Sequence, residues 1–276
     1  MREVVTMKNA TRTLTDNLKH YMAHRVRAKI QFVAIEKLKQ WILDDIDKRI
    51  IIVLDHKQKI LPMKYREGQV EYYGKKGMSL LGAMLIEGVL HEDLCVLKYS
   101  FEDYVIQLYS DQDHVQVASI VNLILERINE FRPNIREVCL QSDNASCFAS
   151  QDFIPYIYSL NRRRNIPSIV KWIYTEAQTG RGRLDTHFSY LNIMLKSYIE
   201  NAGEIVVESD VVKAFSERDG IAGTSIFLVD ASKLEGPIIN TPFIKKLNKP
   251  DTCNAFGVRG THEDACSLQS LVPILR

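Results

Sequence analysis

Acidic residues follow several apolar runs of this chain directly, in positions where their carboxylates could act together. Asp55 follows the run 50–54, Asp143 follows 138–142, Glu176 follows 169–175, and Asp185 opens a later segment with apolar residues at helical spacing. Carboxylate oxygens are the ligands that hard divalent cations prefer. Two such cations a few ångström apart are the usual means of breaking and joining phosphodiester bonds. The residue types therefore indicate phosphodiester chemistry with Mg²⁺ or Mn²⁺, and with two ions.

The hydrophobic pattern predicts the elements that would hold these residues. Short apolar runs bounded by turn residues predict strands at 50–55, 78–89, 94–99, 136–142 and 168–175, with 104–109 extending the sheet. Apolar residues at helical spacing predict helices over 12–43, from 110–113 to Pro133, over 151–161 and over 184–198. The order helix, then β-β-β-α-β-α-β-α, predicts an α/β fold with a mixed sheet and helices on both faces. This order matches the ribonuclease H-like architecture.

Three parts are expected along the chain of 276 residues: an N-terminal helical basic segment (1–48), a ribonuclease H-like core (49–205) and a C-terminal helical and irregular extension (206–276). The extension is expected to contain a short helix at 210–216 and a strand at 225–229. No apolar run reaches 18 residues, which argues against a membrane span. The first 15 residues are polar and basic, unlike a secretory signal. The five cysteines show no disulfide spacing and indicate a reducing, intracellular compartment.

The predicted topology would bring the acidic residues to one place. In such a sheet the first strand is central and the fourth lies beside it in parallel, so Asp55 and Asp143 would emerge at neighbouring strand ends. The helix after the fifth strand crosses the same edge, and its first turn would present Asp185. Like charges this close repel unless a cation neutralises them. A bound divalent ion is therefore the natural reason to assemble the group.

The third carboxylate has two candidates. Asp185 lies in the first turn of a predicted helix, where an acidic residue also has the simpler role of complementing the helix dipole. Glu176 follows its strand directly and could bind the metal instead.

Basic residues gather in two regions, within 1–49 and around the last predicted strands. Either group could meet phosphate or be a solvated face. Lys171, Arg181 and Arg183 are the candidates for holding the phosphates that flank a cleavage point. His187 could contact phosphate or the leaving group, or it could be a partly buried helix residue.

Three segments resemble the core of transposase-like proteins of eukaryotic DNA transposons: 53–59 (VLDHKQK), 141–145 (QSDNA) and 175–185 (TEAQTGRGRLD). The resemblance implies a ribonuclease H-like core with an Asp-Asp-Glu or Asp-Asp-Asp metal triad, in which Asp55 and Asp143 are the first two carboxylates. It also implies DNA as the partner, with Lys57 among the DNA contacts, and a place of action in the nucleus. It leaves open whether several copies of the chain assemble into a homo-oligomer.

Two other functions compete with metal-dependent cleavage and strand transfer. The first is a nucleic-acid-binding protein that kept the fold and lost the chemistry, because the zinc-binding DNA reader that often precedes such cores is not visible in this sequence. The second is a hydrolase with Cys147 as its nucleophile and His187 as its base, since Cys147 stands in a loop of small residues after a strand. A nucleophilic cysteine requires a nearby base and a lowered pKa.

Overall fold

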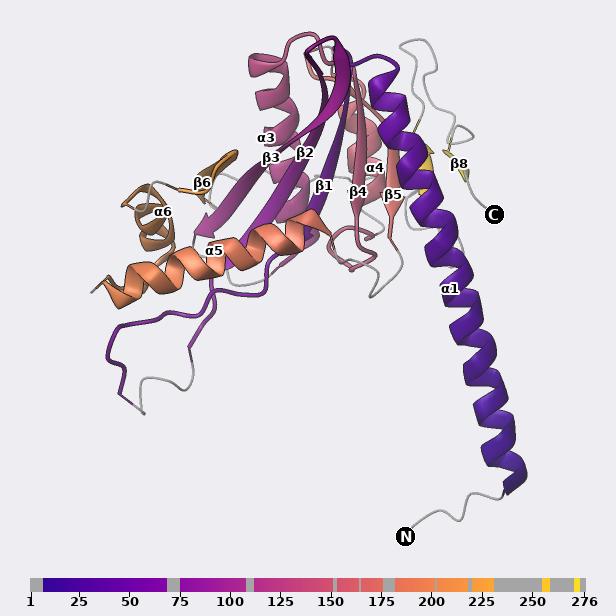
Figure 1. The fold of residues 1–276 in the computed structure, drawn as a ribbon, viewed down its shortest axis with the longest axis horizontal. Coiled ribbons are helices and arrows are strands. Elements are labelled where there is room, and N and C mark those ends of the chain that lie inside the picture. Colours follow the sequence, from indigo (N-terminus) through magenta and orange to yellow (C-terminus); the bar gives the residue numbers. More distant parts are fainter. Residues whose placement is uncertain are drawn as a thin grey trace.

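The structure, a computed structural model, forms one mixed β-sheet with helices on both faces (Figure 1). It describes residues 7–68, 75–107, 112–150, 153–163, 165–175, 182–201, 203–217, 220–230, 255–258 and 271–273. The elements in chain order are α1 (Met7–Leu43), β1 (Arg49–His56), β2 (Ser79–His91), β3 (Leu94–Gln107), α3 (His114–Phe131), β4 (Glu137–Ser142), α4 (Phe153–Leu160), β5 (Ser168–Tyr174), α5 (Arg183–Glu200), α6 (Glu208–Glu217), β6 (Thr224–Asp230), β7 (Ala255–Val258) and β8 (Leu271–Pro273). The predicted α/β class, with a mixed sheet and an N-terminal helix, is confirmed.

The strands lie in the order β6-β3-β2-β1-β4-β5-β7-β8. β2 is antiparallel to both β1 and β3, whereas β1, β4 and β5 run parallel to one another. Parallel neighbours end at the same edge of a sheet. Residues that follow β1 and β4 are therefore brought side by side, although they are far apart in sequence.

β1 is buried on both of its faces, which explains its unbroken apolar run. Ile50, Ile52 and Leu54 pack in the cluster that contains α3 and α4. Ile51 packs in the other cluster, with α1, α5 and α6. Because side chains alternate along a strand, Asp55 points to the same face as Ile51. Figure 1 shows α5 crossing this face of the sheet.

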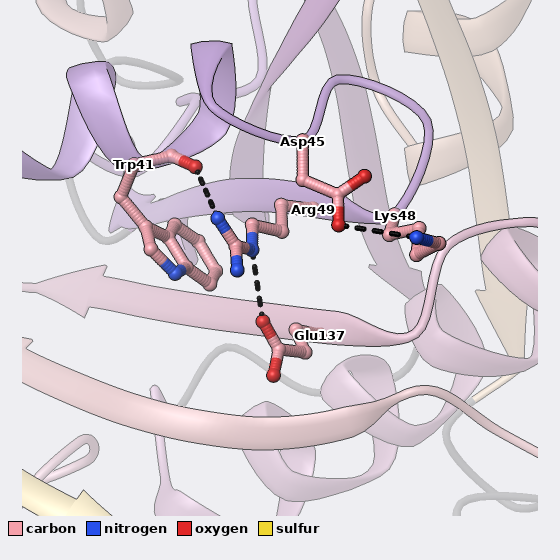
Figure 2. A network of polar contacts seen from close by, with 5 residues as sticks. All are labelled: Trp41, Asp45, Lys48, Arg49 and Glu137. Carbon is pink, nitrogen blue, oxygen red and sulfur yellow. Dashed lines mark hydrogen bonds and ion pairs between the residues drawn. The ribbon is translucent and has the colours of Figure 1, made fainter.

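Polar contacts fix the pairing of β1 with β4 at the opposite edge of the sheet (Figure 2). Arg49, the first residue of β1, pairs in register with Glu137, the first residue of β4. Its Nε donates to Glu137 Oε2 at 3.0 Å and its Nη1 donates to the carbonyl of Trp41 at 3.0 Å. The guanidinium also stands over the Trp41 ring. These contacts join the end of α1 to both strands and accompany the register that brings Asp55 and Asp143 to the far edge.

β2 and β3 form a hairpin with a tight turn, and β3 is longer than the sequence predicted. The turn residues Glu92 and Asp93 both have positive φ, 47° and 65°, the conformation that a two-residue hairpin turn of type I′ requires. β3 then continues unbroken to Gln107, whereas the sequence pattern predicted two pieces separated at residues 100–103. Glu102 and Asp103 interrupt the apolar pattern, but both are buried and have partners inside the protein.

α1 is longer than predicted, and its first part extends beyond the sheet (Figure 1). The apolar stripe that predicted the helix includes Leu14, Leu18, Met22 and Val26, which are 56–71% exposed. Only the later part packs against the sheet, through Leu38 and Ile42 among others. The periodicity therefore identified the helix correctly without identifying the face that is buried.

The extension after residue 205 contains the two elements expected there. The predicted short helix is α6, and the predicted strand is β6, which pairs in parallel with β3 and lies in the same sheet as the core strands. Within the part of the chain that the structure describes, no helix is long and apolar enough to cross a membrane.

Candidate carboxylate site

The pairing of β1 with β4 aligns Asp55 with Asp143. Val53 and Gln141 are register partners in this parallel pair. Asp55 and Asp143 each come two residues later, so both lie at the same edge and on the face that α5 crosses. The strand register therefore places Asp55 and Asp143 at neighbouring strand ends, as the sequence predicted.

The charges of three aspartates meet at Asp55. The pKa of its carboxyl is raised to about 7, firstly by burial and then by the negative charges of Asp143 and Asp185. A hydrogen bond from the backbone of His56 opposes this rise. Charge interactions weaken with distance and with solvent screening. The charges of Asp143, at the end of β4, and of Asp185, at the start of α5, therefore both reach Asp55 on β1.

Asp143 and Asp185 are both exposed, and local hydrogen bonds orient both. Oδ1 of Asp143 accepts from the backbone N–H of Ala145 at 3.0 Å, which stabilises the turn after β4. Oδ2 of Asp185 accepts from the backbone N–H of Gly182 at 2.9 Å, at the start of α5. Asp185 thus lies in the first turn of α5, where it can complement the helix dipole as in its simpler interpretation, and its side chain also caps the helix start. Its charge also reaches Asp55.

Asp103 is a residue of this region that the sequence interpretation missed. It lies on β3 and is fully buried, and its Oδ2 is 2.8 Å from Nε2 of His187, which is also buried. The His187 ring stacks on Phe101 at a centroid distance of 4.3 Å. One signal could have drawn attention to Asp103: it stands next to the apolar residues 104–106, as Asp55 stands next to its own apolar run.

Lys57 and His187 were both candidates for DNA contacts, and the structure places both side chains inside the protein. Lys57 is 5% exposed; burial lowers its pKa, while the charge of Asp103 opposes that change. His187 is 2% exposed. Neither side chain reaches the surface where a DNA backbone would lie, so we no longer assign them to DNA. For His187, the alternative of a buried helix residue agrees with its position.

The remaining candidates for DNA contacts lie on different elements. Arg183 is exposed at the start of α5, with its guanidinium 4.1 Å from the centre of the Tyr99 ring. Lys171 lies on β5 opposite Cys139 and is half-buried. Arg181 and the alternative third carboxylate Glu176 lie outside the described residues.

The environment of Cys147 argues against a cysteine hydrolase. Burial raises the pKa of its thiol to about 11, and the charges of Asp143 and Asp55 contribute to this rise. This is the opposite of what a nucleophilic thiolate requires. The proposed base, His187, is hydrogen-bonded to Asp103 instead.

The donor atoms at this edge suit a hard divalent cation in type and in charge. Asp55, Asp143 and Asp185 offer carboxylate oxygens, and the raised pKa of Asp55 reflects first its burial and then repulsion by the other two, which a cation would relieve. Among the described residues, however, no three His, Cys, Asp or Glu side chains already stand in a metal-binding arrangement. The site therefore fits a metal by its chemistry, and its carboxylates would have to draw closer to hold one.

Comparisons with known proteins give little further help. No family model and no curated protein matches this chain. A solved structure of NurA bound to dAMP and manganese matches with 11% sequence identity over 82% of this chain and 43% of the NurA chain, at a TM-score of 0.22. This chain thus spans less than half of that protein. A TM-score this low carries no argument about fold or activity, so a function for this protein depends on its own residues.

Proposed function

We propose that this protein is a metal-dependent enzyme that cleaves DNA and transfers strands, with a ribonuclease H-like core of the transposase type. The strand order β3-β2-β1-β4-β5 and the strand directions agree with the topology that the sequence resemblance implies. The proposed metal ligands are Asp55, Asp143 and Asp185, and DNA is the proposed partner. A nuclear place of action is part of the same proposal.

One observation carries this proposal: the charges of Asp143 and Asp185 act on Asp55 and help to raise its pKa to about 7. Asp143 stabilises a turn and Asp185 stabilises the start of α5, but neither local role requires their charges to reach Asp55, whereas three neighbouring carboxylates would suit the binding of divalent cations. The same observation supports Asp185 as the third ligand. Glu176 remains a candidate because it lies outside the described residues.

The residues of the chain have separate roles in this proposal. Asp55 would hold a metal from the rigid end of β1, while Asp143 and Asp185 would complete the site from more exposed positions. Bound Mg²⁺ or Mn²⁺ would supply activation of water or a 3′-hydroxyl and stabilisation of the departing oxygen. Arg183, exposed two residues before Asp185, would hold a neighbouring phosphate.

A second function remains in competition, that of a DNA-binding protein without catalytic activity. One observation favours it: no ready-made metal-ligand group exists among the residues that the structure describes. This alternative predicts DNA binding that weakens as salt rises, without metal-dependent cleavage.

Nicking of supercoiled DNA and strand transfer, assayed with Mg²⁺ or Mn²⁺, separate the two functions. We expect wild-type activity to fall by at least about 100-fold in Asp55→Asn, Asp143→Asn and Asp185→Asn, since each removes a charged metal ligand while keeping the side-chain shape. Asp47→Asn is the matched control, because Asp47 is exposed just before the other end of β1. DNA binding without cleavage would favour the inactive alternative, and equal nicking by wild type and Asp55→Asn would contradict the enzyme.

A further inference from the structure

A buried polar cluster lies beside the carboxylate site and takes no part in the proposed chemistry. Asp103 and His187 form a hydrogen bond at 2.8 Å, with side-chain exposures of 0% and 2%. The positive charge of Lys57 acts on Asp103. Burying a carboxylate is unfavourable unless partners compensate for its lost hydration. A cluster of this kind therefore makes a connection between β3 and α5 that is costly to break.

The sheet places Asp103 in one cross-strand row with Asp55. Asp55 pairs with Gly82, and Gly82 pairs with Asp103. Residues opposite one another across neighbouring strands present their side chains on the same face. In this row the carboxylates of Asp55 on β1 and Asp103 on β3 face α5, and Gly82 between them on β2 has no side chain.

Gly82, the middle of this row, is where α5 rests on the sheet. A Cβ atom at this position would lie 2.5 Å from Cε1 of Phe188 and 3.2 Å from Cδ1 of Leu184. Leu184 and Phe188 are one helical turn apart and both are buried. They form the stripe of α5 that faces the sheet directly above β2.

Asp185 and His187 stand on opposite sides of this stripe. An α-helix turns by about 100° per residue, which places the two side chains roughly 80° to either side of the line through Leu184 and Phe188. His187 reaches from one side to Asp103 on β3. Asp185 is then turned to the other side, where β1 carries Asp55, and its charge does act on Asp55.

We propose that Asp103 and His187 are positioning residues, which fix the rotation of α5 about its axis and so direct Asp185 toward Asp55. Apolar contacts at Leu184 and Phe188 hold the helix on the sheet but constrain its rotation weakly, because they are not directional. A hydrogen bond from one flank, with the His187 ring stacked on Phe101, supplies the missing constraint. This inference rests on the proposed function only where it concerns metal affinity.

The test uses His187→Leu, which removes the hydrogen bond while keeping an apolar side chain. Two quantities are measured in the whole protein: hydrogen exchange at the amides of residues 187–190, compared with 194–199, and Mn²⁺ affinity by titration followed by electron paramagnetic resonance. We expect exchange at 187–190 to be about tenfold faster, with 194–199 unchanged, and the Kd for Mn²⁺ to rise about tenfold, as for other residues that orient metal ligands.

Matched variants separate positioning from a general loss of stability. His187→Gln, whose amide nitrogen can take the place of Nε2, should restore most of both properties. Tyr190→Leu changes an exposed residue of the same helix and should alter neither. In an Asp185→Asn background, His187→Leu should cause no further loss of Mn²⁺ affinity, because it acts through Asp185. Asp103→Asn should give the same pattern with a smaller effect, and it replaces His187→Leu if that variant does not fold.

Two results would overturn the positioning role: unchanged exchange at 187–190 in His187→Leu, or an equal loss of Mn²⁺ affinity with and without Asp185. Absence of Mn²⁺ binding by the wild type would instead contradict the proposed function. The exchange measurement would then still decide whether the buried pair anchors the start of α5.

Discussion

Asp55 carries the largest electrostatic conflict of the proposed site. Burial and two neighbouring carboxylates raise its pKa from the ordinary value near 3.8 to about 7. In the unfolded chain the same carboxyl would titrate at its ordinary pKa. Between these two values the folded protein holds a proton that the unfolded chain has lost, so the folded state loses stability relative to the unfolded state as pH rises.

This conflict predicts how Asp55→Asn should respond to pH in the absence of divalent metal. Asparagine keeps the shape of the side chain without the charge. We therefore expect the variant to have a higher Tm than the wild type at pH 8, and we expect the difference to shrink through pH 7 and to vanish near pH 4. Thermal unfolding between pH 4 and pH 8 in the presence of a chelator measures this. Mg²⁺ added at pH 8 should raise the Tm of the wild type more than that of the variant.

Asp47→Asn provides the comparison for that experiment, because it removes an exposed carboxylate from the opposite end of the strand. Its Tm should follow the wild-type curve at every pH. If Asp55→Asn also followed the wild-type curve, Asp55 would not be buried among other negative charges, and the main support for the metal site would be lost.

At the scale of elements, the site depends on how closely α5 approaches the sheet. Gly82 permits the ring of Phe188 to occupy the space where a Cβ atom would otherwise lie. The requirement is steric, because Gly82 sits within a paired strand and its backbone does not need positive φ. Glycine in the interior of a strand often marks such a close approach.

We expect Gly82→Ala to lower the free energy of unfolding by about 1–3 kcal/mol, as overpacking of a core typically does. It should also lift the start of α5 and lower cleavage activity. Phe188→Leu in the same chain should recover part of both losses, because the smaller side chain makes room for the added methyl group. Urea denaturation of the two single variants and the double variant measures the coupling. Strictly additive losses would show that Phe188 does not rest on Gly82.

The same elements show what could be predicted from the sequence. The apolar run of β1 and the runs before Asp143 and Glu176 predicted strands, and parallel pairing then predicted that Asp55 and Asp143 meet. Asp103 was missed because an acidic residue inside a strand interrupts the apolar pattern, and only the fold brings His187 to it. Lys57 and His187 were assigned to DNA because the sequence alone does not reveal which polar side chains turn inward.

At the scale of the whole molecule, a basic helix extends from the edge that carries the carboxylates. Nε2 of Gln31, on α1, donates to the carbonyl of Tyr174 at the end of β5. Tyr174 pairs with Ser142, the residue directly before Asp143. α1 therefore passes the site edge at Gln31, and its earlier residues extend beyond the sheet (Figure 1). Between residues 7 and 30 it carries six Lys and Arg residues and one acidic residue, Asp16.

If DNA is the partner, this helix should supply part of the phosphate contacts, since the logarithm of the affinity falls with the logarithm of salt by about 0.9 for each phosphate neutralised. We expect the triple variant Arg12→Gln, Lys19→Gln and Arg25→Gln, all at exposed positions, to reduce that slope by about 2–3. Fluorescence anisotropy with duplex DNA at several salt concentrations measures it. The control, Lys48→Gln, Lys196→Gln and Lys213→Gln, removes the same charge from exposed positions elsewhere. Equal slopes for the two variants would mean that DNA is attracted by net charge alone, and that α1 has no special place in guiding DNA to the carboxylates.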